Sequence, residues 1–212
     1  MQDEGGLRER KKRETRKRIS DVATALFMMR GFDAVTVLEV AEAANVSKMT
    51  VFNYFPRKED MFFDRDEESR ELIRQALLER RKGTSPLSAL RSLVRRLVEE
   101  RHPFAKFDAG IAGFWKTVTD SAALTMRARE MRGELERDLA ELLVASAGGR
   151  KPDPRAKLLA GMIASAGTVA YAEGLRRVRA GESSARARKA FVALLERCFR
   201  SVAAGFADTP YV

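Results

Sequence analysis

Residues 36–58, TVLEVAEAANVSKMTVFNYFPRK, limit what this chain can fold into more than any other stretch. The first part predicts a short helix, because Thr36 can cap its N-terminus and Glu39, three residues later, completes a capping box. Small apolar residues then recur at helical spacing and give this helix one face that can be buried: Val37, Val40, Ala41 and Ala44.

A turn and a second short helix follow directly. Asn45 stands where the turn needs a left-handed residue, which asparagine tolerates better than most other non-glycine residues. Ser47 can cap a second helix over residues 48–55. Pro56 ends that helix, because the residue before a proline disfavours the α conformation. Two such helices form a helix-turn-helix, a motif whose second helix can enter the major groove of DNA.

The second helix has two chemically different faces. Val51 and Phe55 share one face, which we expect to be buried. The opposite face carries a cation and a phenol, which suit phosphates, and an amide and a hydroxyl, which suit base edges. The side chains expected to face outward are Lys48, Met49, Thr50, Asn53 and Tyr54.

The spacing of these residues is typical of a known family. The pattern consists of Thr36, Val40-Ala41, Ala44, Val46-Ser47-Lys48, Thr50-Val51-Phe52, Tyr54-Phe55-Pro56 and Lys58-Glu59. Over residues 13–61 the chain therefore resembles the tetracycline-repressor (TetR) family of transcriptional regulators. The rest of the chain resembles that family only in its length and helical character.

The resemblance implies a role for each residue of the candidate DNA-binding set. Phosphates would be held by Thr36, Tyr54 and Lys58, and bases would be faced by Lys48, Met49, Thr50 and Asn53. Asn53 on adenine and Lys48 on guanine are the natural pairings, and a good bidentate contact contributes ~1–3 kcal/mol of discrimination. The resemblance also implies a palindromic operator in double-stranded DNA and a small-molecule effector that releases it.

Four residues depart from the family's pattern. Met49 stands where the family often has glycine, so its thioether could touch a thymine methyl or cover the protein's core. Phe52 stands where tyrosine is usual, which removes a phosphate-binding hydroxyl. Asn45 replaces a common glycine, with no expected change of function. Arg57 replaces a common capping residue, and its cation could instead grip a phosphate.

Composition and charge favour an all-α protein with a polyanionic partner. The sequence has no run of alternating β-branched residues bounded by turns, so strands are not expected. The formal net charge is +10, which favours an anionic partner such as DNA. Cations gather near the N-terminus, as either a phosphate-binding arm or a solvated tail. They are Arg8, Arg10, Lys11, Lys12, Arg13, Arg16, Lys17 and Arg18.

The predicted organisation is a three-helix DNA-binding head followed by a six-helix regulatory and dimerisation bundle, about nine helices in all. We expect residues 1–9 to be the disordered start of a basic arm, 10–56 to be the helix-turn-helix domain, and 57–212 to be the ligand-binding and dimerisation domain. Amphipathic periodicity predicts the longer helices over residues 10–30, 57–81, 86–101, 122–147, 154–180 and 184–207.

Aromatic and methionine side chains could line a pocket for a mostly apolar effector, with His102 as a polar handle. The same residue types at helical spacing are typical of an ordinary core, and the sequence leaves both interpretations open. The candidate pocket residues are Phe63, His102, Phe104, Phe107, Phe114, Trp115, Met126, Met131, Met162 and Tyr171.

The last two helices are predicted to form a homodimer interface, because small residues on the first and apolar residues on the second let another copy approach closely. The alternative is a face that packs within one chain. A palindromic operator calls for a two-fold symmetric protein, which favours the dimer. The candidate interface residues are Gly161, Ala164, Ser165, Phe191, Leu195, Phe199 and Val202.

The sequence argues against catalysis and metal binding. His102 is the only histidine and Cys198 the only cysteine, whereas a zinc site draws several such residues together. The spacing of a glycine-rich phosphate loop is absent, so we expect no cofactor and no enzyme. A lone cysteine and the lack of a long apolar run predict a cytoplasmic protein without a membrane partner.

The expected function is that of a sequence-specific DNA-binding transcriptional regulator. By family resemblance it would be a repressor that a small molecule releases from a palindromic operator. Two alternatives stay open: a sequence-tolerant DNA-binding protein, and an effector-binding protein whose head does not read DNA. Met49 and Phe52 are the residues that keep the second alternative open.

Overall fold

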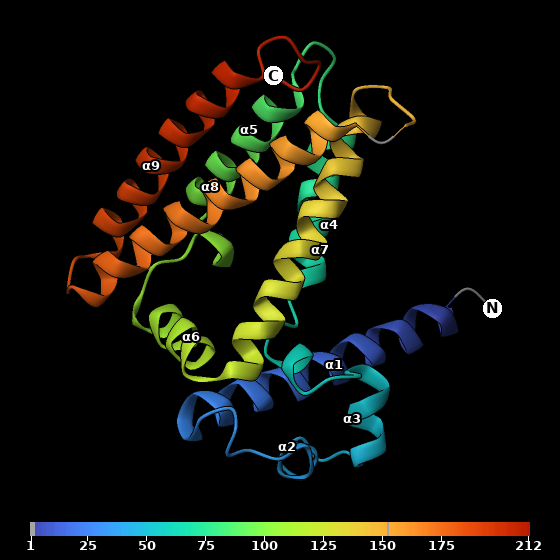
Figure 1. Ribbon diagram of the computed structural model, residues 1–212. Helices are drawn as coiled ribbons and strands as arrows, with labels where there is room; N and C mark the ends of the chain where they lie inside the picture. Colours follow the sequence, from blue (N-terminus) through green and yellow to red (C-terminus); the bar gives the residue numbers. More distant parts are fainter. Residues whose placement is uncertain (1–2, 152) are drawn as a thin grey trace. The chain divides into compact units, whose positions relative to one another are not determined.

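The computed structural model describes residues 3–151 and 153–212, which contain helices and no strand (Figure 1). The chain divides into two compact units. The head unit comprises Met1–Asp66 and Gly113–Ala128, and the large unit comprises Glu67–Ala112 and Arg129–Val212. The all-α prediction is therefore confirmed for the part of the chain that the structure describes.

Nine α-helices and two short 3-10 helices occur in the described residues. They are α1 (Asp3–Arg30), α2 (Val37–Ala43), α3 (Lys48–Tyr54), η1 (Glu59–Met61), α4 (Asp66–Leu78), α5 (Pro86–Glu99), η2 (Pro103–Ala105), α6 (Ala109–Asp120), α7 (Ala122–Ser146), α8 (Pro154–Arg179) and α9 (Ser184–Gly205). The predicted bounds of α5, α7, α8 and α9 agree with the structure to within two residues. Side chains of Ser85, Asp153 and Ser183 cap α5, α8 and α9, so local chemistry sets where these helices begin.

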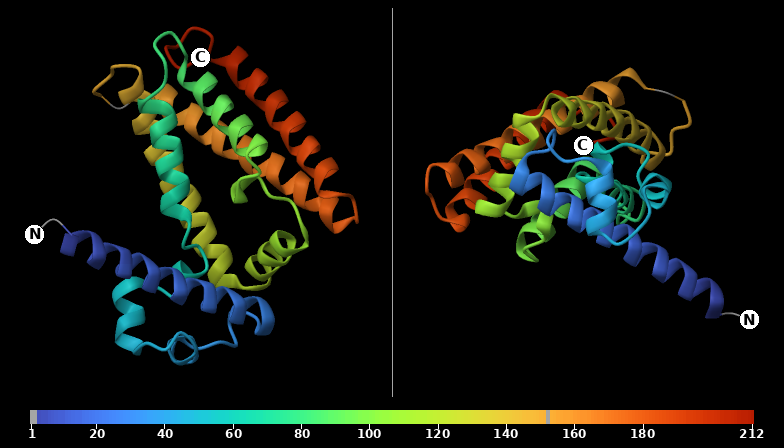
Figure 2. Two further views of the ribbon diagram at one scale, coloured as in Figure 1. Left: turned by 180° about the vertical axis from the view of Figure 1, so that it is seen from behind. Right: turned by 90° about the horizontal axis from the view of Figure 1, so that it is seen from below.

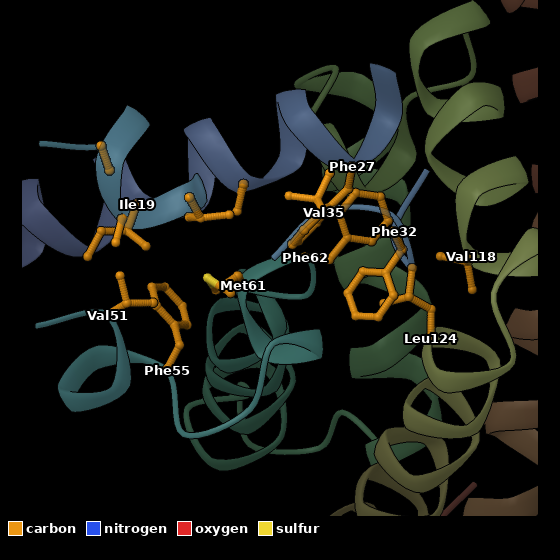
Figure 3. Close-up of a cluster of buried hydrophobic side chains, with 14 residues drawn as sticks. Ile19, Phe27, Phe32, Val35, Val51, Phe55, Met61, Phe62, Val118 and Leu124 are labelled. Carbon is orange, nitrogen blue, oxygen red and sulfur yellow. The ribbon is translucent and has the colours of Figure 1, made fainter. Parts of the chain in front are cut away.

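Apolar side chains from α1, α2, α3 and η1 form the core of the head unit (Figure 3). Phe27 of α1 is fully buried, and its ring meets the Phe32 ring edge-on at a centroid distance of 4.9 Å. Val51 and Phe55 are buried in the same cluster as Ile19. Burying one large apolar side chain contributes roughly 1.5–3 kcal/mol, so these contacts hold the three helices together.

A segment far along the sequence completes the head core. The Phe114 ring stacks on the Phe62 ring at 4.1 Å between centroids, and Val118 and Leu124 are buried beside them. The Arg127 guanidinium donates to the Asp60 carboxylate at 2.9 Å. The predicted boundary between residues 56 and 57 therefore differs from the structure, in which residues 57–66 and 113–128 belong to the head unit.

Two predicted helix boundaries are wrong. Residues 3–9, expected to be disordered, are the first turns of α1, because a helix that is already anchored gains a hydrogen bond for each residue it adds. Residues 1–2 lie outside the described residues. The helix expected over 57–81 is divided into η1 and α4. It breaks because Met61 and Phe62 are both buried and the Met61 carbonyl accepts from the Ser20 hydroxyl at 3.1 Å.

In the large unit, α8 and α9 lie side by side, and α5 packs on α9 (Figures 1 and 2). The C-terminal residues fasten this bundle. The Leu87 amide donates to the Tyr211 carbonyl at 2.9 Å, and the Tyr211 hydroxyl donates to Asp153 at 2.5 Å. Burial, together with this bond, raises the pKa of Tyr211 to about 12.

Helix α8 is the one described helix that is long and apolar enough to cross a membrane on length and composition alone. Within the structure, 39% of its most apolar window is buried. Its buried side includes Ala160, Ile163 and Ala170, which face the rest of the large unit. The apolar character of α8 thus has two parts, a core face and a face that remains exposed.

The substitution Gly174→Ala should lower the free energy of unfolding by about 1–3 kcal/mol. Gly174 is buried in α8, and a methyl group there would overlap the Phe107 ring. Urea unfolding would measure the loss. Gly133→Ala on α7 is the matched control, because the nearest heavy atom to an added methyl lies 3.8 Å away and alanine favours a helix by ~1 kcal/mol over glycine. Equal stability of the two variants would show that the contact with Phe107 is not close.

Candidate nucleic-acid interface

Helix α3 is fastened at both ends and along one side. The Ser47 hydroxyl accepts from the Thr50 amide at 3.0 Å and caps the helix, as predicted. Asn45 adopts a φ of 51°, so the turn does use a left-handed residue there. Val51 and Phe55 are buried with at most 1% of their surface exposed. These contacts fix which side of α3 faces away from the protein.

The outward side of α3 consists of Lys48, Met49, Phe52 and Asn53, all exposed, and is here called the reading face. The spacing i, i+1, i+4, i+5 places the four on one side of the helix. Met49 is 68% exposed, so it does not cover the core, which was one of the two roles left open by the sequence. Phe52 is 41% exposed, and the Lys48 ammonium lies 5.9 Å from the centroid of its ring.

Thr50 and Tyr54 are less outward than the sequence predicted, because both are half-buried. The Thr50 hydroxyl lies 2.8 Å from the Ser47 hydroxyl and therefore supports the helix cap. Tyr54 packs against the head core. Their contacts with bases and phosphates stay predictions. The exposed side chains of the reading face are better placed for such contacts.

Arg16 is a positioning residue that the sequence showed only as part of a basic run. Its guanidinium donates to the Tyr54 carbonyl at 2.8 Å and pairs with Asp64 at 2.7 Å. It also lies 4.3 Å from the centroid of the Phe55 ring, close enough for a cation–π contact. Arg16 thereby ties α1 to the end of α3. Its spacing of three residues from buried Ile19 was the available sign that it faces inward.

Thr36 and Glu39 form the predicted capping box at the start of α2. The Glu39 amide donates to the Thr36 hydroxyl at 3.2 Å, and the Thr36 amide donates to the Glu39 carboxylate at 2.7 Å. Arg30 pairs with the same carboxylate at 2.7 Å. The Thr36 amide first, and then Arg30, lower the pKa of Glu39 to about 2. Thr36 is exposed, and its phosphate contact stays a prediction.

Lys58 occupies a position different from the expected one. Its ammonium donates to the Phe32 carbonyl at 2.5 Å and lies 4.1 Å from the centroid of the Phe32 ring. Burial lowers the pKa of Lys58. The side chain therefore ties η1 to the loop after α1, and a phosphate contact would require it to leave this carbonyl. Arg57 beside it is exposed.

The basic residues of the first turns of α1 lie on a helix rather than in a flexible arm. In Figures 1 and 2 these turns extend past α2 and α3 within the head unit. The exposed cations there are Arg8, Arg10, Lys11, Lys12 and Arg13. A helix holds these charges at fixed spacing, which suits a row of phosphates.

The candidate pocket residues belong to both units. Those in the head unit are Phe63, Phe114, Trp115 and Met126, and those in the large unit are His102, Phe104, Phe107, Met131, Met162 and Tyr171. Phe63, Phe114 and Trp115 pack against the head core. Met126 and Met162 are exposed, with fractions of 62% and 38%. Phe107 is buried against Gly174, so it is part of a packed core rather than of a pocket wall.

Four of the candidate dimer residues are buried within the chain, and their contact with a second copy stays a prediction. Phe191, Leu195, Phe199 and Val202 are each at most 6% exposed, because this face of α9 packs within the chain. The sequence showed an apolar stripe but not which neighbour covers it. The small residues of α8, Gly161, Ala164 and Ser165, are partly exposed and remain candidates.

Comparisons with known proteins agree with this geometry. Residues 19–64 match the family model described as bacterial regulatory proteins, tetR family. The chain is 34% identical over 93 residues to the transcriptional regulator TcmR of Streptomyces glaucescens. This match covers 44% of this chain and 41% of TcmR. It is 34% identical over 88 residues to AcrR of Shigella flexneri, covering 41% of each. The matches thus span about two fifths of these curated relatives.

Solved structures extend the likeness beyond the head. The TetR-family repressor FadR of Thermus thermophilus, in complex with lauroyl-CoA, is 26% identical with a TM-score of 0.54, covering 88% of this chain and 92% of FadR. A complex of SmeT with triclosan shares the fold, with 15% identity and a TM-score of 0.58, covering 89% of this chain and 91% of SmeT.

The contribution of the Glu39 carboxylate to stability should depend on pH. Its pKa is about 2 in the folded protein and about 4.5 as the unperturbed reference, so the unfolded chain binds more protons between these values. Stability from Glu39 is therefore present above pH 4.5 and lost as the pH falls toward 2. The difference in free energy of unfolding between the wild type and Glu39→Ala should shrink over that window, measured by urea unfolding at each pH.

Thr36→Ser is the matched control for that series, because it keeps the hydroxyl and the amide that hold the carboxylate. It should retain the wild-type pH profile. A difference between wild type and Glu39→Ala that stays constant from pH 7 to pH 2 would contradict the assigned pKa.

Proposed function

Because residues 19–64 match the tetR family model, we propose that the chain is a TetR-family DNA-binding transcriptional regulator and a repressor. We expect it to act in the cytoplasm, as a homodimer that binds a palindromic operator in double-stranded DNA. A small molecule that binds the large unit releases the protein from this operator. The observation that carries this proposal is the reading face, a row of exposed side chains on a helix whose opposite side is fastened to the core.

The reading face has the chemistry that base recognition needs. Asn53 can donate to and accept from adenine, and Lys48 can donate to guanine. Both are exposed, while Val51 holds the other side of the same helix in the core. A base reader must be rigidly positioned to discriminate, and Arg16 and Ser47 supply that rigidity. The surface therefore supports sequence-specific reading.

Phosphate contacts provide the remaining affinity. The exposed cations of α1 and the exposed Arg57 are the groups best placed to neutralise phosphates. Neutralised phosphates release counterions, so binding should weaken as salt rises, with a slope of about −0.9 per phosphate contact in a log–log plot. A protein that used only these phosphate contacts would bind DNA of any sequence. Competitor DNA of any sequence would then displace it from the operator.

The second copy is proposed to dock on the outward face of α8. Leu158, Met162 and Val169 lie along that face with exposed fractions of 60%, 38% and 56%. Gly161 and Ser165 lie between them and allow close approach of another helix. A self-complementary apolar face gives a two-fold dimer, which is the symmetry that a palindrome requires.

The effector is proposed to be a mostly apolar small molecule. The FadR structure contains lauroyl-CoA, whose lauroyl chain is apolar. In the large unit, His102, Phe104, Met131 and Tyr171 are partly exposed and remain candidate contacts. The ligand needs only to bind the non-DNA-binding conformation more tightly than the other for the equilibrium to shift.

Selection of bound fragments from random DNA with the purified full chain should yield one palindromic operator. Asn53→Ala should then lose about tenfold in affinity and lose its preference at one position in each half-site, since a bidentate base contact contributes ~1–3 kcal/mol. Lys11→Ala is the matched control, because a phosphate contact should weaken binding to all sequences alike. Selected pools without a common motif, or an unchanged Asn53→Ala footprint, would contradict sequence-specific reading.

Leu158→Glu should convert the dimer to a monomer in analytical ultracentrifugation, because two-fold symmetry places two buried charges in one interface. Operator affinity should fall at least tenfold with it. Leu78→Glu is the control, since Leu78 is an exposed leucine on α4 of the same unit, with 43% of its surface exposed. If Leu158→Glu sediments as the wild type does, α8 is not part of the dimer interface.

A further inference from the structure

An apolar side chain stands on the reading face where polar groups would be expected. Met49 belongs to the first turn of α3 and is 68% exposed. Each methylene group left in water forgoes about 0.8 kcal/mol of burial free energy, so a thioether of this size in solvent brings the free protein no stability. A partner that covered the thioether would gain that burial free energy.

The anchoring of α3 prevents Met49 from turning inward. Val51 and Phe55 are buried on the opposite side, and the Ser47 cap fixes the start of the helix. Rotation of α3 that would bury Met49 would expose both anchors. Whatever α3 docks against therefore meets the thioether together with its neighbours on the reading face.

The neighbours of Met49 on α3 limit where on a bound partner its contact can lie. Asn53 lies one helical turn further along the same row, at i+4. Lys48 and Phe52 form the adjacent row, where the ammonium lies 5.9 Å from the centroid of the phenyl ring. Phe52 thus carries a cation beside its ring, and Met49 is the uncharged apolar end of the reading face.

The major groove offers one apolar group to such a side chain. Base edges there present hydrogen-bond donors and acceptors, except for the C5 methyl group of thymine. Methionine is unbranched and polarizable, so it can adapt to the shape of a methyl group at the groove floor. We propose that Met49 is a specificity-determining residue that packs on a thymine methyl in each half-site, beside the base pair that Asn53 reads. This inference rests on the proposed function.

The test replaces thymine by deoxyuridine in the operator selected by the wild-type protein, one position of each half-site at a time. Deoxyuridine keeps the pairing and every hydrogen-bonding group and removes only the methyl. At one position the wild type should lose about fourfold in affinity per half-site, which corresponds to one buried methyl group. Fluorescence anisotropy at fixed salt would measure the dissociation constants.

The substitution Met49→Ala identifies the side chain responsible. It should bind the thymine operator several-fold less tightly than wild type and should no longer distinguish thymine from deoxyuridine at that position. Met29→Ala is the matched control, because Met29 is an exposed methionine of the same unit, with 74% of its surface exposed, on α1. It should keep the wild-type methyl effect. Both substituted side chains are solvent-exposed, so folding is checked by unfolding midpoints equal to that of wild type.

The outcomes separate this inference from the proposed function. An operator that is selected but shows no methyl effect at any thymine, or a methyl effect that persists in Met49→Ala, would overturn the role of Met49 and leave sequence-specific binding intact. Selection that yields no motif would overturn the proposed function and this inference with it. A Met49→Ala variant with unchanged operator affinity would point to a protein partner for the exposed thioether and would likewise overturn the inference.

Discussion

The burial of Val51 and Phe55 against α1 is the contact on which the rest of the head depends. Helix α3 is too short to be stable on its own in water, so it exists as a helix because this apolar side is covered. Covering one side of so short a helix also decides what the other side presents. The reading face is therefore a consequence of packing as much as of its own polar residues.

Polar contacts then add positional precision to this apolar anchor. Arg16 reaches from α1 to the carbonyl of Tyr54, and Lys58 reaches to the carbonyl of Phe32, so each joins two segments that are distant in sequence. Arg30 ties the end of α1 to the start of α2 through Glu39. A buried or half-buried cation is stable only when it finds such partners. These contacts hold the segments next to α2 and α3 in place.

Amphipathic patterns showed where helices would form in the large unit but not which neighbour would cover each face. Helix α9 has a strong apolar stripe, and Phe191, Leu195, Phe199 and Val202 were expected to meet a second copy. They are buried within the chain. The exposed apolar side belongs instead to α8, through Leu158 and Val169. Periodicity measures how apolar a face is, and a covered face and an open face have the same periodicity.

Local chemistry determined the features that the sequence alone predicted correctly: the caps at Thr36, Ser47 and Ser85, the left-handed turn at Asn45, and the burial of Val51 and Phe55. Each of these depends on residues a few positions apart. Only the tertiary structure decided that residues 113–128 join the head, that Lys58 turns to a backbone carbonyl, and that Met49 stays outside the core. These outcomes depend on contacts between segments distant in the sequence, and no local pattern encodes which of two similar surfaces will meet.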